Sequence, residues 1–294
     1  MAVDAPLLIA DVPWLLYRAN FSLPKSIKGA DGKPVNALLG TVNALLAAIE
    51  SERPRAVVVC FGAEEARYRV EAYPPYHAHR DPMHEDLAAQ WALAQDLLAS
   101  FGWHVADAGD LEADDAMGAY ARAEGEGGGR ALLLTADRDL YQAVDEHVAV
   151  LDLGKGGACV ARGPEHVQES YGVSPERVPD FIALRGDPSD GIPGAPGIGA
   201  KTAAELLRAH GTLEALLEAA ERQMAEANFG ELRPRVASAL SENAELLRTF
   251  KRIATLVPIE VERPPDTLTD FGGGAAKARE LGMKRLAERL DAME

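Results

Sequence analysis

The sequence predicts an α/β fold in which a mainly parallel sheet with flanking helices is followed by a smaller helical region. Two observations support this prediction. Over the first half of the chain, short apolar runs that close on acidic residues alternate with segments of helical periodicity. From Pro175 onward, short helical segments are joined by a turn rich in glycine and proline at 190–202. Strands separated by helices pair in parallel, because a parallel connection has to cross back over the sheet.

The strands expected in this sheet are short and apolar. A β-branched run such as AVVVCF at 56–61 is typical of a buried strand. Runs of this kind predict five strands, at 7–10, 56–61, 103–106, 130–137 and 148–153. The segment 37–49 has helical periodicity and no breaker after Gly40. In parallel sheets, ligands bind just beyond the carboxyl ends of the strands.

Two regions depart from this alternation. The segment 62–85 is rich in Tyr, Pro, Arg and His and is long for a plain connection, so we expect it to be functional or mobile. Near the end of the chain, 264–274 is expected to form a loop and 275–293 a terminal amphipathic helix.

The composition favours a globular protein of one or two domains. The chain has 294 residues, 47% of them hydrophobic, so it can bury a sizeable core. Its two cysteines, Cys60 and Cys159, are too few and too scattered for a disulfide framework, which favours a reducing compartment. The N-terminus lacks the basic start of a signal peptide, and no run approaches the ~20 apolar residues of a membrane span. We therefore expect a cytoplasmic protein without a membrane partner.

The net charge of −16 at first argues against nucleic acid as a partner. The charge is unevenly distributed, however. Residues 101–190 hold 18 acidic and 7 basic residues, whereas residues 191–294 hold 16 acidic and 14 basic residues. Many of the acidic residues are expected to form ordinary solvated surface. That explanation fits less well for the carboxylates that follow apolar strands.

Eight acidic residues stand at the ends of expected elements. Helix capping, which stabilises by roughly 0.5–2 kcal/mol, explains single members such as Asp114 or Asp187. It does not explain a set that converges on one edge of the sheet. Asp137 and Asp139 are two apart and are expected to face the same side of an extended backbone. The full set is Asp11, Glu112, Asp114, Asp115, Asp137, Asp139, Asp187 and Asp190.

Converging carboxylates repel one another, and divalent cations supply the missing positive charge. Hard oxygen ligands select Mg²⁺ or Mn²⁺. Two such ions ~4 Å apart can activate a water and stabilise a leaving oxygen in phosphodiester cleavage. The sequence contains neither a His/Cys cluster with zinc spacing nor a Walker A motif.

Four motifs occur in the chain in the order LEADD, TADRDL, GDPSDGIPG and GIGAKTA. In this order and spacing they resemble the bacterial 5′→3′ exonuclease and flap endonuclease family. That family includes the N-terminal domain of DNA polymerase I and free-standing relatives. The length leaves no room for a polymerase, so the resemblance implies a stand-alone, metal-dependent 5′→3′ exonuclease or flap endonuclease that acts on DNA. The resemblance implies action on 5′ flaps, nicked or branched duplex and 5′ ends during replication and repair, independent of sequence, with a monomer favoured.

The resemblance also implies a domain organisation. A PIN-like (resolvase-like) nuclease domain would span 1–172 and carry an arch region at about 63–90. A helical domain of the helix-hairpin-helix (H3TH) type would span 173–262. A C-terminal loop and helix would occupy 263–294.

By position, the resemblance assigns the carboxylates to two metal sites. Asp11, Glu112 and Asp114 would hold the first ion, and Asp114, Asp137, Asp139 and Asp190 would hold the second. Asp115 and Asp187 would support these ligands through water or neighbouring contacts. In the arch region, His77 and Arg80 would steady the scissile phosphate, Arg67 and Arg69 would contact phosphates, and Tyr76 would stack on a base. Tyr68 and Tyr73 are expected to be packed instead.

The turn before Ala200 resembles the hairpin of that family. Gly194, Gly197 and Gly199 would let the backbone approach a phosphate, and the next helix would present free N–H groups there. Lys201 adds positive charge, Thr202 would join the contact, and K⁺ often bridges hairpin carbonyls and a phosphate in the family. The alternative for this segment is an ordinary connection between two helices.

Two positions depart from the family pattern. Gly62 stands where an Asp usually follows the second strand, which predicts a weakened first metal site. His77 stands where a Lys usually follows the Tyr, and a histidine is cationic only when protonated. We therefore predict that activity falls steeply from pH 6 to pH 8 and that His77→Lys flattens this profile.

Three alternatives remain open from the residues alone. A DNA-structure-binding protein with little catalysis is suggested by Gly62 and the weakly charged arch region. A PIN-type ribonuclease shares the acidic site but generally lacks the hairpin. A haloacid-type phosphatase would need a second Asp after the first strand, where this chain has Asp11-Val12-Pro13.

Overall fold

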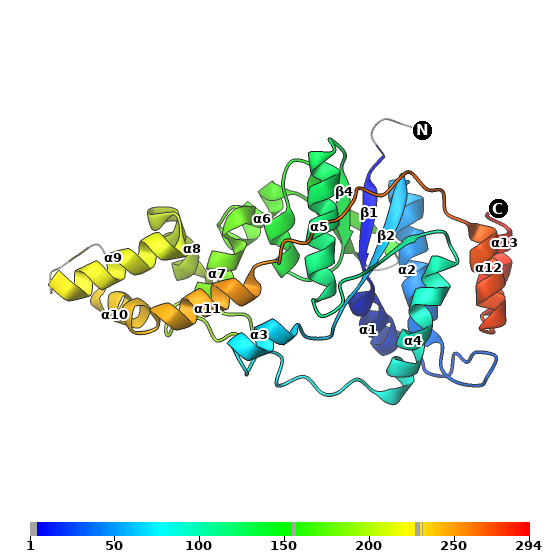
Figure 1. The fold of residues 1–294 in the computed structure, drawn as a ribbon, viewed down its shortest axis with the longest axis horizontal. Helices are drawn as coiled ribbons and strands as arrows, with labels where there is room; N and C mark the ends of the chain where they lie inside the picture. Colours follow the sequence, from blue (N-terminus) through cyan, green and yellow to red (C-terminus); the bar gives the residue numbers. More distant parts are fainter. Residues whose placement is uncertain (1–4, 155–156, 227–229, 231) are drawn as a thin grey trace.

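A computed structural model of the protein describes residues 5–154, 157–226, 230 and 232–294. Its centre is a six-stranded sheet with the order β3-β2-β1-β4-β5-β6 (Figure 1). All neighbouring pairs are parallel except β5 and β6, which are antiparallel. The strands are β1 (Leu7–Asp11), β2 (Ala56–Phe61), β3 (His104–Asp107), β4 (Ala131–Leu134), β5 (Val148–Leu153) and β6 (Cys159–Arg162). The predicted α/β class and mainly parallel sheet are confirmed, although β4 is shorter than expected and β6 was not foreseen.

Both faces of the sheet are covered, so the central strands β1 and β4 are apolar except for Asp11 at the end of β1. Along β1, Leu7 and Ile9 belong to one core cluster, and Leu8 and Ala10 belong to the other. The first cluster includes α5 (Ala113–Glu126). The second includes residues of α1 (Val12–Ser22), α2 (Asn36–Glu52) and α4 (Glu85–Ala99). Because the strand side chains alternate between faces, each strand ties the two helical layers together.

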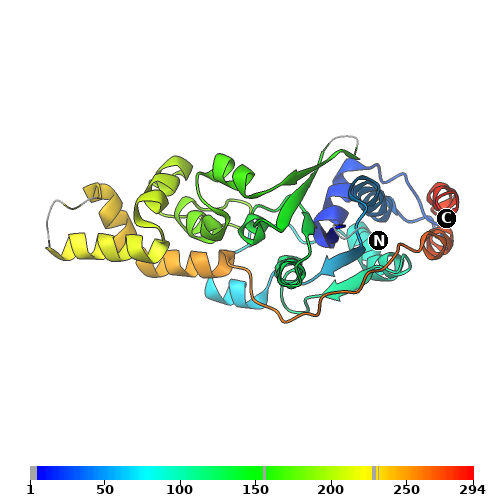
Figure 2. The same cartoon turned by 90° about the horizontal axis from the view of Figure 1, so that it is seen from above.

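The helical part of the chain extends away from the sheet, as the two views in Figures 1 and 2 show. Two short 3₁₀ segments pack against each other: Asp139–Ala143 (η1), between β4 and β5, and Pro175–Arg177 (η3), in the helical part. The segment 67–84 forms the short helix α3 (Arg67–Ala72) and a run of turns before α4. The remaining helices are α6 (Pro164–Tyr171), α7 (Val178–Arg185), α8 (Ala200–His210), α9 (Leu213–Glu226), α10 (Pro234–Glu242) and α11 (Ala244–Ala254).

After α11 the chain returns to the sheet domain as an extended segment, 256–270 (Figure 1). Two contacts of this segment are the Thr267 N–H, which donates to the Arg55 carbonyl at 3.0 Å, and the Asp270 N–H, which donates to the Phe101 carbonyl at 2.8 Å. Arg263 donates to the buried Glu124 carboxylate from both Nε (2.9 Å) and Nη2 (3.0 Å). The same carboxylate also pairs with Arg55, so a buried charge network anchors the segment.

The predicted single terminal helix is wrong. The chain ends in two helices, α12 (Phe271–Glu280) and α13 (Lys284–Asp291), which are separated by a turn. Gly282 lies in this turn at φ 82°, and a Cβ there would meet the Ala30 backbone. The helix α12 also includes glycines that were expected to be loop, because the Asp270 side chain accepts from the Gly273 N–H and caps the helix.

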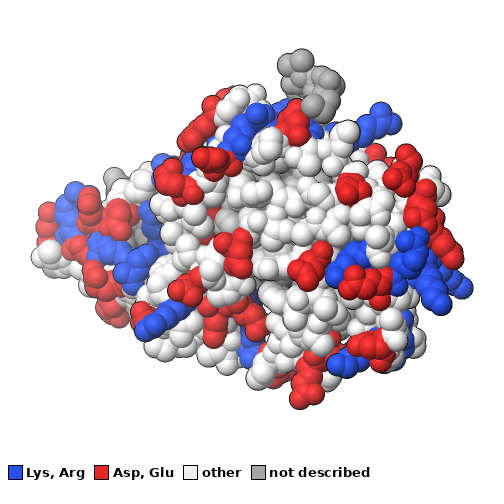
Figure 3. All heavy atoms as spheres, turned by 45° about the vertical axis from the view of Figure 1, so that its right-hand side comes forward, with Lys and Arg blue, Asp and Glu red and all other residues white. Residues whose placement is uncertain are grey.

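The surface carries interspersed charges, as the face in Figure 3 shows. Within the described ranges, no helix has the length and apolar character needed to cross a membrane.

Candidate metal-binding site

A pocket of about 840 Å³ opens at the carboxyl ends of β1 and β4. Its walls come from elements far apart in sequence, including the start of α5, the turn after β4 and the segment that follows α3. Six of the eight predicted carboxylates line it: Asp11, Glu112, Asp114, Asp137, Asp139 and Asp190. The parallel sheet thus brings together acidic residues that are separated by up to 179 positions in the chain.

The Asp11 carboxylate is held in place from two sides. Its Oδ1 accepts from the Trp14 N–H at 2.9 Å, so it caps α1, and its Oδ2 accepts from the Thr135 hydroxyl at 2.8 Å. The Thr135 Oγ1 also accepts from the Asp137 N–H at 3.0 Å. Thr135 therefore orients two acidic residues of the pocket, although it was not among the predicted site residues. The available signal was its position directly after the apolar strand run.

Asp137 and Asp139 are neighbours for a different reason from the one predicted. The strand β4 ends at Leu134, so these residues are not on an extended backbone. The Asp137 Oδ1 accepts from the Asp139 N–H at 3.0 Å, and η1 begins at Asp139. A tight side-chain-to-backbone turn places both carboxylates on the pocket.

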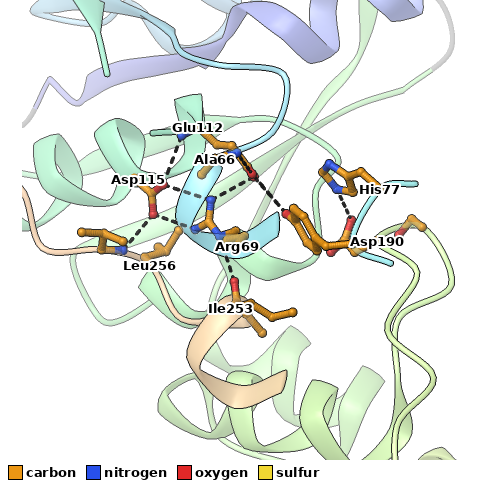
Figure 4. A network of polar contacts seen from close by, with 12 residues as sticks. Ala66, Arg69, His77, Glu112, Asp115, Asp190, Ile253 and Leu256 are labelled. Atoms are coloured by element: carbon orange, nitrogen blue, oxygen red, sulfur yellow. Dashed lines mark hydrogen bonds and ion pairs between the residues drawn. The ribbon is translucent and has the colours of Figure 1, made fainter. Parts of the chain in front are cut away.

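The carboxylates at the start of α5 have separate environments. Glu112 lies on the pocket, and its Oε1 accepts from the Ala66 N–H at 2.7 Å. Asp115 is fully buried, and its Oδ1 accepts from Arg69 Nη2 (2.8 Å) and from the Val257 N–H (2.8 Å). Figure 4 shows Arg69 between Glu112, Asp115 and Ile253. Asp115 is therefore paired with an arginine and does not line the pocket. Because Arg69 also pairs with Glu112, this position is compatible with the predicted supporting role of Asp115, which stays a prediction.

The loop after α7 has two of the predicted carboxylates, and only one of them lines the pocket. Asp190 Oδ1 lies 3.1 Å from His77 Nε2 and 3.3 Å from Arg80 Nη2. Asp187 is buried, and its Oδ1 accepts from both the backbone and the hydroxyl of Ser189. Asp187 does not line the pocket, and its predicted supporting role stays a prediction.

The crowding of the pocket raises carboxyl pKa values. Burial, partly opposed by hydrogen bonds, raises the pKa of Asp11 to about 6. Burial and the nearby Asp190 raise the pKa of Asp137 to about 6. The pKa values of Asp114 and Asp139 lie well above the usual range, first because of burial and then because of the neighbouring Asp137. Each of these groups costs free energy when ionised, and a cation among them would offset that cost.

The donor atoms suit a hard divalent cation. Asp139 Oδ1 is a buried oxygen without a hydrogen-bond partner, which is costly unless another ligand satisfies it. Among the described residues, no three acidic, histidine or cysteine side chains form a ready-made cation cluster. The carboxylates therefore share one pocket without being preassembled around a single point.

Gly62 is packed against the start of α5. A Cβ at this position would stand 2.5 Å from the Leu111 carbonyl oxygen, 2.6 Å from the Ala113 nitrogen and 2.7 Å from the Glu112 carbonyl carbon. These neighbours are backbone atoms, so a side chain at position 62 would displace the helix start that presents Glu112. The missing side chain is therefore a requirement of this packing.

The expected DNA contacts of the arch region are only partly available. Tyr76 is 4% exposed, its hydroxyl donates to Glu112 Oε2 at 3.1 Å, and its ring stacks on His77 at 3.8 Å between centroids. Tyr76 is therefore not free to stack on a base, and Arg69 is not free to contact phosphates. Tyr73 packs edge-on against Phe250, as predicted. Arg80, with 47% of its side chain exposed, lines the pocket.

The glycines of the hairpin serve two purposes. Gly194 is buried, and a Cβ there would meet the Gly186 nitrogen at 2.4 Å, so this glycine permits chain packing. Its predicted contact with DNA stays a prediction. Gly197 and Gly199 are exposed, with open space where a Cβ would stand. The helix α8 begins at Ala200, and Lys201 is exposed beside Thr202 in its first turn.

Comparison with known proteins decides the family. The model of the 5′-3′ exonuclease N-terminal resolvase-like domain matches residues 6–172, and that of the 5′-3′ exonuclease C-terminal SAM fold matches residues 173–269. The chain belongs to the 5′-3′ exonuclease family. A 5′-3′ exonuclease of Mycobacterium tuberculosis is 33% identical over 318 residues, which cover 98% of this chain and 99% of that protein.

Other members of the 5′-3′ exonuclease family that match the chain are longer. The thermostable DNA polymerase I of Thermus thermophilus is 38% identical over 284 residues, which cover 97% of this chain. This chain spans only 32% of that polymerase.

Solved structures share the fold. The bacteriophage T5 flap endonuclease in complex with DNA and metal ions superposes with a TM-score of 0.68 at 18% identity, covering 98% of each chain. The catalytic core of Rad2 in complex with a DNA substrate gives 0.65 at 13% identity, covering 99% of this chain and 91% of that chain.

Proposed function

We propose that this member of the 5′-3′ exonuclease family hydrolyses DNA phosphodiester bonds at 5′ flaps and 5′ ends with the help of Mg²⁺ or Mn²⁺. One observation supports the proposal most directly: six carboxylates from distant elements line one pocket. Three similarities support the proposal: the 5′-3′ exonuclease relative, the T5 flap endonuclease in complex with DNA and metal ions, and the catalytic core of Rad2 in complex with a DNA substrate.

The six lining carboxylates would hold the cations, with Asp11, Glu112 and Asp114 on one side and Asp137, Asp139 and Asp190 on the other. When bound, divalent ions supply a Lewis acid for the phosphate and activate water. Thr135 keeps the Asp11 carboxylate oriented, and Arg69 fixes Glu112 through a 3.0 Å ion pair. Arg80 at the pocket wall would bind a non-bridging phosphate oxygen as a hydrogen-bond donor.

The hairpin before α8 would hold the duplex through its backbone phosphates. Gly197, Gly199 and the first turn of α8 are exposed, and Lys201 adds a cation. A K⁺ ion at the hairpin carbonyls would strengthen this contact. Phosphate contacts carry no base information, so binding would be independent of sequence and sensitive to salt.

We also propose two structural units that meet between residues 172 and 173, with the segment 263–294 as a C-terminal addition. The boundary between the two family models supports the first division. Ala275 and Leu286 belong to the core cluster that includes residues of α1, α2 and α4, which supports placing the last helices with the sheet domain.

The test is cleavage of a 5′-labelled flap oligonucleotide with Mn²⁺, using Asp139→Asn and Asp190→Asn. Both variants are expected to lose turnover while flap binding stays measurable, because each removes one of the carboxylates proposed to hold the cations. Glu288→Gln, an exposed carboxylate of α13, is the matched control and should cut normally. Undiminished cleavage by Asp139→Asn would refute the proposed site.

A second candidate is a DNA-structure-binding protein with little or no catalysis. Gly62 and the lack of a preassembled three-ligand cluster in the described ranges favour it. Binding of the flap by the wild-type chain without any cleavage in Mn²⁺ would establish this candidate instead.

A further inference from the structure

A second polar pocket, of about 510 Å³, lies between the candidate metal site and the hairpin. It is walled by the turn after β4, by α6, by α7 and by the first residue of α8. Arg138, one of its lining residues, stands between Asp137 and Asp139 in the chain. Ala200, another, begins the hairpin helix. A strand held at both sites would therefore pass over this pocket.

Two arginines give the pocket its charge. The guanidinium groups of Arg138 and Arg185 make no ion pair or hydrogen bond with any described residue, although Arg185 lies over the Phe181 ring at 5.9 Å. The one carboxylate in the lining, Asp152, is already paired with Arg162 at 2.8 Å. Two unpaired arginines in one pocket stand out in a chain of net charge −16.

The remaining lining offers hydrogen-bond donors. Tyr141 and Tyr171 both line the pocket, and a phenolic hydroxyl can donate a hydrogen bond. The N-cap of α8, Gly199, forms no side-chain capping bond, which leaves the first N–H groups of this helix without such a partner. Guanidinium forks and phenolic hydroxyls together suit a tetrahedral oxyanion.

We infer that the pocket lined by Arg138 and Arg185 binds a backbone phosphate of duplex DNA. This contact is separate from the hairpin contact and would set the path of the strand between the hairpin and the metal site. The inference rests on the proposed function, because it takes DNA as the ligand.

The test measures binding of a 5′-flap duplex by fluorescence anisotropy in EDTA over a series of KCl concentrations. Loss of one phosphate contact lowers the slope of log K against log [KCl] by about 0.9. We expect Arg138→Ala/Arg185→Ala to lower the slope by about 1 and to weaken binding about tenfold or more at fixed salt. Arg138→Lys/Arg185→Lys, which keeps the charge without the fork, should recover most of the slope.

The matched control is Lys284→Ala/Arg285→Ala on α13, which removes the same charge at the opposite end of the molecule (Figures 1 and 2). Its slope should equal that of the wild type. The inference would be overturned if the slope fell equally in the Arg138/Arg185 and the Lys284/Arg285 alanine variants. It would also be overturned if the slope of the Arg138/Arg185 variant did not change. Arg138→Ala alone, at an exposed position, provides the same test if the double variant does not fold. If the wild-type chain does not bind the duplex, the proposed function is refuted as well. If the wild-type chain binds and the Arg138/Arg185 variant has an unchanged slope, only the inference about this pocket is refuted.

Discussion

The backbone at Gly62 lies so close to Leu111 that a Cβ atom there would stand 2.5 Å from the Leu111 carbonyl oxygen. The neighbouring Ala63 N–H donates to the same oxygen at 2.8 Å. This contact joins the end of β2 to the start of α5, where Glu112 and Asp114 enter the pocket. The absence of a side chain at position 62 is thus coupled to the position of two candidate ligands.

Gly62→Asp is therefore expected to disturb the site and to gain no metal ligand. Overpacking against backbone costs roughly 1–3 kcal/mol, so thermal unfolding should begin at a lower temperature than in the wild type. Calorimetric titration should show weaker Mn²⁺ uptake. Gly62→Ala is the control without a new charge and should show the same direction of both changes. An additional Mn²⁺ ion bound by Gly62→Asp at full stability would contradict this explanation.

Arg69→Met should destabilise the protein strongly. The substitution leaves Asp115 buried without its ion pair and also removes the ion pair of Glu112. Breaking a buried ion pair in this way costs about 3–5 kcal/mol. Denaturant unfolding measures the change. Arg67→Met on the same helix is the matched control, because its side chain is 84% exposed and, in the part of the chain that the structure describes, pairs only with Glu71. A loss of stability in Arg67→Met as large as that in Arg69→Met would mean that helix α3, and not the buried pair, is responsible.

The stability of the protein in EDTA should fall as the pH rises from 5 to 7. The pKa values of Asp11 and Asp137 are raised to about 6 in the folded state, so the folded chain binds more protons than the unfolded chain above pH 4. Stability then decreases with pH through this window, and the higher pKa values of Asp114 and Asp139 extend it upward. Differential scanning calorimetry at several pH values checks the slope.

Mn²⁺ should reverse this trend, because it binds the ionised carboxylates and so stabilises the folded state more at higher pH. Asp139→Asn should raise the melting temperature in EDTA at pH 7 and reduce the response to Mn²⁺. A melting temperature that rises from pH 5 to pH 7 in EDTA would show that the crowded carboxylates do not control stability.

His77→Lys should flatten the dependence of cleavage on pH between 6 and 8. A lysine at this position keeps its charge over the whole range. The wild-type His77 is buried beside Asp190 and has a left-handed backbone conformation with φ 54°. Its backbone N–H donates to the Asp190 backbone carbonyl at 3.1 Å. Single-turnover cleavage of the flap at saturating Mn²⁺ measures the profile. His79→Lys, a change at a neighbouring position, is the control, and identical profiles in His77→Lys and the wild type would refute the role.

Local sequence patterns were sufficient for most of the sheet and helix order. Strands such as β1 and β5 follow from apolar runs, because both faces of a parallel strand are buried. The terminal helices were less predictable. The glycines at the start of α12 predict a loop, but the Asp270 side chain caps this segment as a helix. The turn at Gly282 depends on packing against the Ala30 backbone.

The sequence by itself determined which residue types gather at the strand ends, because a parallel sheet delivers those ends to one edge. Only the tertiary structure decided which carboxylates remain available there. Asp115 is neutralised by Arg69, 46 positions away, and Asp187 is used by its own turn, so neither lines the pocket. The tertiary structure likewise decided that Gly62 and Gly194 serve chain packing. Periodicity depends on neighbours along the chain, whereas ion pairing and close approach depend on segments that meet only after folding.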